Sequence, residues 1–137
     1  MYKVLIVDDE LDVCTSCANF LSRRGYQVDT AQSAEVALQK ISENMPEVIL
    51  LDITMPGMGG IEGLKQIKMI NPQVSVIMVT ASSDAMTSEE AMRLGASGYI
   101  TKPVTAETLE RLIKVTMTVD EAKRQIDLER KLEEDVE

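Results

Sequence analysis

The chain has 137 residues, 45% of them apolar, which is enough for one globular domain with a buried core and too few for two ordinary domains. Its 14 basic and 23 acidic side chains give a net charge of −9, so we expect no direct nucleic-acid binding by this chain. Because no apolar stretch reaches the roughly 20 residues of a membrane span, and no signal segment follows Met1, we expect no membrane contact and a cytoplasmic location.

Strand and helix patterns alternate along the chain. Short apolar or alternating runs predict strands at residues 3–7, 26–31, 48–51, 74–79 and 98–101. Apolar residues recurring every three or four positions predict a helix after each strand. The residues that carry these helix patterns are Leu11, Cys14, Ala18 and Leu21, then Val36, Ala37 and Ile41, then Ile61, Leu64 and Ile67, then Ala91, Met92 and Leu94, and finally Leu109, Leu112 and Ile113.

Turn and cap residues separate these elements. Ser33 is typical of a helix N-cap, and Pro46 ends the helix that follows it. The run Pro-Gly-Met-Gly-Gly at residues 56–60 predicts a loop. The strict alternation predicts a doubly wound, flavodoxin-like α/β domain, with a five-stranded parallel sheet covered by helices on both faces.

Polar residues stand at the ends of four of the predicted strands. Asp8 and Asp9 follow the first strand, Asp52 ends the third, Thr80 ends the fourth and Lys102 follows the fifth. In open α/β sheets, ligands collect at the edge that the carboxyl ends of the parallel strands form. Clustered carboxylates repel one another unless a cation neutralises them, and an all-oxygen ligand set suits Mg²⁺. With a hydroxyl and an ammonium nearby, these are the groups needed to place a phosphoryl group on a carboxylate.

At these residues the sequence resembles the receiver domain of two-component response regulators, over about residues 1–118. The motifs that carry the resemblance are Asp8-Asp9, Asp52 with Met55-Pro56-Gly57, Thr80-Ala81 and Lys102-Pro103. The resemblance implies that Asp52 is the phosphoacceptor. It also implies that Asp8, Asp9, Asp52 and the main-chain carbonyl of Thr54 bind Mg²⁺, and that Lys102 and Thr80 contact the phosphoryl group.

The same resemblance implies a function and further roles. The chain would be a switch of a phosphorelay, taking a phosphoryl group from a phosphohistidine of a sensor histidine kinase or phosphotransfer protein and hydrolysing it slowly, rather than a conventional turnover enzyme. Thr80 and Tyr99 would form the conformational switch, and Thr54 and Ser82 would set the lifetime of the phosphate. The peptide bond before Pro103 is expected to be cis.

Two other classes of function fit parts of the pattern. A Mg²⁺-dependent phosphatase-like hydrolase commonly carries a second acid two residues after its nucleophile, where this chain has Thr54. A flavodoxin-like ligand-binding module needs stacking groups, and only 3% of the residues are aromatic. The site residues also have simpler interpretations. Asp8 and Asp9 could cap the first helix, and Tyr99 could be an ordinary core or surface aromatic. Thr80 could be an ordinary strand-end residue, and Lys102 a solvated surface lysine.

Cys14 and Cys17 are the only cysteines, and they lie three apart in a predicted helix. Such a pair can be a redox motif or half of a metal site, but the sequence has no second pair and no histidine to complete a zinc site. The absence of histidine also excludes a histidine-dependent catalytic triad. We therefore expect two free cysteines near the inner face of the helix.

Residues 119–137 form an appendage that the compact domain does not need. They contain no glycine or proline, and Asp120 with Arg124 and Asp127 with Lys131 have the spacing of helical ion pairs, so we expect them to extend the last helix. Apolar residues keep a three-four spacing across the junction at Leu112, Val115, Val119, Ala122 and Ile126, and then slip in phase to Leu128, Leu132 and Val136. We expect a linker helix of the coiled-coil type. It would pair with a second copy in a parallel homodimer and lead toward an output domain. The alternative is a solvated, fraying helix.

Overall fold

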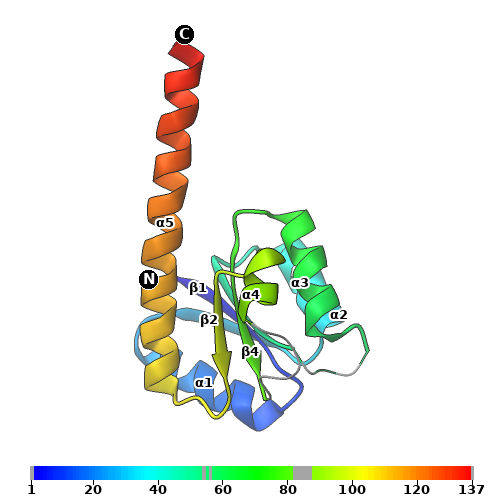
Figure 1. Ribbon diagram of the computed structural model, residues 1–137. Helices are drawn as coiled ribbons and strands as arrows, with labels where there is room; N and C mark the ends of the chain where they lie inside the picture. Colours follow the sequence, from blue (N-terminus) through cyan, green and yellow to red (C-terminus); the bar gives the residue numbers. More distant parts are fainter. Residues whose placement is uncertain (1, 54, 56, 82–87, 137) are drawn as a thin grey trace.

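Strands and helices alternate along the chain in the computed structural model, which describes residues 2–53, 55, 57–81 and 88–136 (Figure 1). The elements are β1 (Lys3–Val7), α1 (Leu11–Arg23), β2 (Gln27–Ala31), α2 (Ala34–Glu43), β3 (Val48–Asp52), α3 (Gly59–Ile70), β4 (Ser75–Thr80), α4 (Ser88–Arg93), β5 (Gly98–Thr101) and α5 (Ala106–Val136). Each predicted strand is present, with bounds that differ from the prediction by one residue at most.

The strands form one parallel sheet in the order β2-β1-β3-β4-β5. This order confirms the predicted doubly wound fold, with β3 in the centre and buried along its whole length. The register pairs Val7 with Leu51, Asp52 with Val79, and Thr80 with Thr101. The carboxyl ends of β1, β3, β4 and β5 are therefore level with one another at one edge of the sheet.

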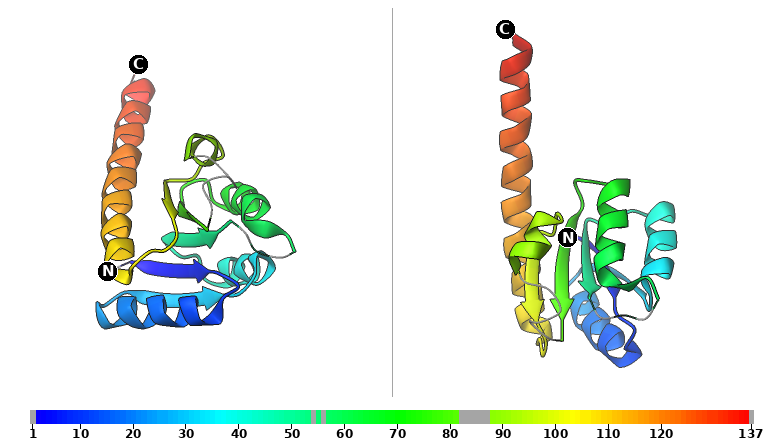
Figure 2. Two further views of the ribbon diagram at one scale, coloured as in Figure 1. Left: turned by 60° about the horizontal axis from the view of Figure 1, so that its bottom comes forward. Right: turned by 45° about the vertical axis from the view of Figure 1, so that its right-hand side comes forward.

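Helices cover both faces of the sheet (Figure 2). On one face, α2, α3 and α4 pack on strand residues such as Leu5, Leu51 and Met78. On the other face, α1 and α5 pack on the alternate residues, such as Ile6 and Leu50. Successive residues of a strand point to opposite faces, so strands buried on both sides must be apolar without interruption. This explains why the three central strands, β1, β3 and β4, are mostly continuous apolar runs, whereas β2 at the sheet edge alternates.

Three residues of the predicted helix patterns are exposed: Leu11, Val36 and Met92. The buried arc of α1, α2 and α4 is therefore narrower than the pattern suggested. In α2 the buried residues are Ala34, Ala37 and Ile41. Val36 comes two residues after Ala34 and one before Ala37, and these steps turn a side chain by about 200° and 100° around the helix. Val36 therefore points away from the sheet, although it is apolar.

The predicted loop at residues 56–60 ends earlier than expected, because α3 begins at Gly59. The main-chain N–H of Gly60 donates to the carbonyl oxygen of Ile53 at 3.0 Å. A Cβ atom at Gly60 would collide with the carbonyl oxygen of Asp52 and lie 2.6 Å from the Cα of Ile53. Only glycine lets the first turn of α3 approach the end of β3 this closely.

The last helix, α5, has 31 residues and is about 46 Å long, at 1.5 Å per residue. Its C-terminal part projects beyond the sheet (Figure 2), which confirms the predicted helical extension. Asp120 and Arg124 bond to Ser75 and to the Gln73 carbonyl rather than to each other. Within the described part of the chain, no helix combines the length and the apolarity that crossing a membrane requires.

Replacing Gly60 with alanine should lower the free energy of unfolding by about 3 kcal/mol or more, because the new methyl group meets rigid backbone atoms of β3. Gly59→Ala is the matched control, since a Cβ there has nothing within 4 Å and the cost of its φ of 77° is about 1 to 2 kcal/mol. Urea unfolding of the two variants measures the difference. Equal losses would show that α3 does not approach β3 this closely.

Candidate functional site

Main-chain hydrogen bonds hold the polar residues in place where the strands end. The N–H of Asp8 donates to the Ala31 carbonyl at 3.0 Å, and that of Lys102 donates to the Thr80 carbonyl at 2.7 Å. The N–H of Ile53, next to Asp52, donates to the Val79 carbonyl at 3.0 Å. Each functional side chain therefore starts from a backbone position that the sheet fixes. The prediction that Asp8, Asp52, Thr80 and Lys102 gather at one edge is confirmed.

Three carboxylates form the acidic part of this site. Asp8, Asp9 and Asp52 each offer an oxygen within 4.8 Å of the others. The side chains of Asp8 and Asp52 are buried, while Asp9 is exposed. One oxygen of Asp8 also accepts from the N–H of Glu10 at 3.0 Å, which fixes the carboxylate orientation. A compact, all-oxygen donor set with an open side matches a hard divalent cation that keeps part of its water shell.

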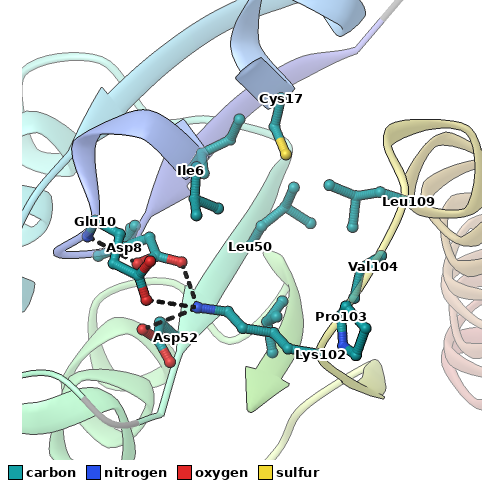
Figure 3. Close-up of a pocket in the computed structure, with 13 residues that line it drawn as sticks. Ile6, Asp8, Glu10, Cys17, Leu50, Asp52, Lys102, Pro103, Val104 and Leu109 are labelled. Atoms are coloured by element: carbon teal, nitrogen blue, oxygen red, sulfur yellow. Dashed lines mark hydrogen bonds and ion pairs between the residues drawn. The ribbon is translucent and has the colours of Figure 1, made fainter. Parts of the chain in front are cut away.

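The ammonium group of Lys102 lies among these acids (Figure 3). Its Nζ is 2.8 Å from Oδ2 of Asp8, 3.5 Å from Oδ2 of Asp52 and 4.0 Å from Oε1 of Glu10. Burial opposes the charged form of Lys102. The hydrogen bond to Asp8 and the negative charges of Asp8, Asp52 and Glu10 outweigh burial and raise the pKa of Lys102 above its ordinary value of 10.5. The lysine therefore stays protonated at neutral pH and places a positive charge at the carboxyl end of the sheet.

The structure describes some of the other predicted site residues but not all of them. Thr80 is buried at the end of β4, and Tyr99 is half-buried on β5, packed against the core under α2, α3 and α4. The bond between Lys102 and Pro103 is cis, as predicted. Thr54 and Ser82 lie outside the described residues, so their predicted roles are not tested.

Sequence reasoning missed two neighbours of the site. Oε1 of Glu35, in the first turn of α2, accepts from the N–H of Met58 at 2.9 Å and so braces the segment that follows Asp52. The thiol of Cys14 donates to the main-chain carbonyl of Asp8 at 3.2 Å. Neither residue type is distinctive at its position, so no sequence signal marks these contacts. They depend on how α1 and α2 pack on the sheet.

The two cysteines are free thiols, as predicted. Burial, followed by the negative charge of Asp8, raises the pKa of Cys14 to about 11. The pKa of Cys17 is also raised, again mainly by burial. A nucleophilic or metal-binding cysteine needs a lowered pKa. Both residues therefore act as small core side chains, and the chemistry of the site belongs to the acids and the lysine.

A cleft of about 400 Å³ opens beside the acids. Asp8, Asp52 and Lys102 stand at one end, and the remaining wall is mostly apolar (Figure 3). The apolar lining residues include Ile6, Cys17, Leu50, Val104 and Leu109. An apolar wall next to a charged cluster gives an incoming molecule a surface to pack on while its polar group meets the acids and the lysine.

Comparison with known proteins agrees with this geometry. Residues 4–114 match the family model described as the response regulator receiver domain. The chain is 36% identical to the transcriptional regulatory protein ZraR of Escherichia coli K12 over 121 residues, which are 85% of this chain and 27% of that protein. The chain thus spans about a quarter of the length of that relative.

Solved structures give the same result. NtrX from Brucella abortus matches with a TM-score of 0.85 and 31% identity, over 92% of this chain and 29% of that one. A CheY-like receiver domain protein from Methanospirillum hungatei matches with a TM-score of 0.82 and 33% identity, over 90% of this chain and 98% of that one. These matches favour the receiver interpretation over the hydrolase and the flavodoxin-like module.

Replacing Lys102 with methionine should lower the free energy of unfolding by about 2 kcal/mol or more in EDTA, because buried Asp8 loses its charged partner. Lys40→Met is the control, since its partner Asp29 is exposed and the expected loss is below about 1 kcal/mol. A raised pKa in the folded state means that the contribution of Lys102 is complete below pH 10.5 and lost only above it. Urea unfolding should give equal differences at about pH 7.5 and 9.5, and a difference that shrank between them would contradict this assignment.

Proposed function

Because the chain belongs to the receiver domain family of two-component response regulators, we propose that it is a phosphorylation-dependent switch with Asp52 as phosphoacceptor. The donor is the phosphohistidine of a sensor histidine kinase or phosphotransfer protein in the cytoplasm. One observation carries the assignment. The buried carboxylate of Asp52 lies close to the acids Asp8 and Asp9, with which it can hold a cation, and its Oδ2 is 3.5 Å from the ammonium of Lys102.

The reaction follows from these positions. An oxygen of Asp52 attacks the phosphorus, the bond between phosphorus and the donor imidazole nitrogen breaks, and that nitrogen takes a proton from water. Mg²⁺, held by Asp8, Asp9, Asp52 and the carbonyl of Thr54, would supply positive charge that offsets repulsion between the acids and the phosphoryl group. Lys102 attracts the phosphoryl oxygens, and the hydroxyl of Thr80 donates to one of them.

Two further features support proteins as the partners of this chain. The apolar wall of the cleft offers a packing surface directly beside Asp52 and Lys102, which a small phosphate ester does not need. The net charge of −9 disfavours direct contact with nucleic acid. We propose that the output instead passes through protein contacts, with residues 1–118 as the receiver and 119–137 as a helical extension through which the chain forms a homodimer.

Asp52 should become phosphorylated by acetyl phosphate only when Mg²⁺ is present, and phosphate-affinity gels measure this. Asp52→Asn and Asp9→Ala should remain unlabelled, while Asp29→Asn, which removes an exposed acid outside the site, should label like the wild type. Full labelling of Asp52→Asn would reject the assignment.

Decay of the label on Asp52 gives the lifetime of the phosphate, which we propose that Thr54 and Ser82 set. Neither side chain is an acid or amide that orients water strongly, so Thr54→Asn should decay faster.

Occupation of the site should move Thr80 toward the phosphoryl group and turn Tyr99 further into the core, because a switch needs a local charge change that biases a movable element. Beryllofluoride with Mg²⁺ mimics the phosphoryl group, and the intrinsic tyrosine fluorescence should change when both are added. The change should be lost in Tyr99→Phe and in Asp52→Asn. An equal change in Tyr99→Phe would show that another tyrosine reports the binding and that Tyr99 is not the switch.

A further inference from the structure

The domain fixes the rotation of α5 well beyond the core. Buried side chains of Leu109, Ile113 and Met117 hold one side of the helix against the sheet. Three polar contacts continue on from there: Ser75 Oγ donates to Asp120 at 2.6 Å, Arg124 donates to the Gln73 carbonyl at 3.0 Å, and Tyr2 Oη donates to Glu121 at 3.2 Å. The direction in which each side chain of residues 106–124 points is therefore set by the fold.

The opposite side of α5 carries an apolar stripe that the domain leaves uncovered. It consists of Val115, Val119, Ala122 and Ile126, and the exposed fractions of Val115, Val119 and Ile126 are 57%, 46% and 49%. At 3.6 residues per turn these four residues lie within about 60° of one another and span about 16 Å along the helix. An apolar stripe of this kind on a helix is typical of pairing with another helix.

A positively charged residue flanks one end of this stripe, and a negatively charged residue flanks the other. Exposed Arg111 lies on the same side, four residues before Val115, and exposed Glu129 lies there three residues after Ile126. In a parallel pair, Glu129 of the two copies would face each other, and so would Arg111. In an antiparallel pair, Arg111 of each copy lies at the level of the partner's Glu129, so opposite charges meet at both ends of the stripe. Like charges that face each other across a helix pair destabilise it.

We propose that two copies of this chain pair antiparallel through the stripe of Val115, Val119, Ala122 and Ile126. Val115 then packs beside the partner's Ile126, and Val119 beside the partner's Ala122. Because the sheet lies on the far side of α5, the two domains are on the outside of the pair and do not obstruct it. This arrangement deepens the proposed homodimer, replaces the parallel pairing expected from sequence, and does not depend on phosphoryl transfer.

The remaining apolar residues of the extension do not contribute to this contact. Leu128 is two residues after Ile126, which turns it by about 200° around the helix, and Leu132 lies close to the same side as Leu128. The phase slip in the sequence is therefore a change of helix face. A parallel coiled coil along the whole extension would need the stripe to continue on one face, where Glu129 stands instead.

Disulfide cross-linking distinguishes the two directions. In a Cys17→Ser background, which leaves buried Cys14 as the only native cysteine, Val115→Cys and Ile126→Cys are oxidised separately and as a mixture. The antiparallel pair should give cross-linked dimer in the mixture and little in either variant alone. Efficient cross-linking of Ile126→Cys by itself would overturn the proposal in favour of a parallel pair. A monomer by light scattering of the wild type, with and without beryllofluoride, would overturn it altogether.

Charge reversal gives an independent check on the same chain. Arg111→Glu and Glu129→Arg should each weaken the dimer roughly threefold to tenfold, because each reversal places like charges at both ends of the stripe. The double variant should restore the dimer constant to within about twofold of the wild type. Equal weakening by the single and the double variants would contradict the antiparallel register. Labelling of Asp52 in the same variants reports phosphoryl transfer separately, so failure of one proposal leaves the other intact.

Discussion

The ammonium group of Lys102 holds the acidic side chains together at the carboxyl end of a buried sheet. Asp8 and Asp52 are almost fully enclosed, and two buried carboxylates a few ångströms apart would repel each other strongly without a cation. Lys102 lies within ion-pair distance of both and of Glu10. The lysine therefore makes the fold compatible with an acidic site, and in the proposed function the same charge attracts the oxygens of the phosphoryl group.

The precision of this site comes from rigid elements that approach it closely. Gly60 lets the first turn of α3 lie against the carbonyl of Asp52, and Glu35 braces the segment that follows β3. The thiol of Cys14 binds the main chain of Asp8 from α1. Helices from both faces of the sheet thus restrain the same few residues. A carboxylate held in this way has little freedom left to lose on reaction, which is how a preorganised site lowers a barrier.

The strand β4 and the segment before α5 both link the site to the projecting helix. The strand β4 ends in Thr80 beside Asp52, and its first residue, Ser75, donates a hydrogen bond to Asp120 of α5. The segment that carries Lys102 and Pro103 leads directly into the same helix. The strand and this segment therefore both join the carboxyl end of the sheet to the projecting helix. In a receiver domain this gives a short physical path from the carboxylate to the exposed stripe of α5.

The sequence by itself determined the order of strands and helices and the residues at the strand ends, because uninterrupted apolar runs, helical periodicity and terminal acids are local patterns. It also predicted the continuous α5 from the absence of glycine and proline. Only the tertiary structure decided which apolar residues are buried, since Leu11, Val36 and Met92 fit the period yet point away from the sheet. It alone revealed the start of α3 at Gly59, the contacts of Glu35 and Cys14, and the binding of Asp120 to Ser75 instead of Arg124. Each of these depends on distances between segments far apart in the chain, which no local pattern encodes.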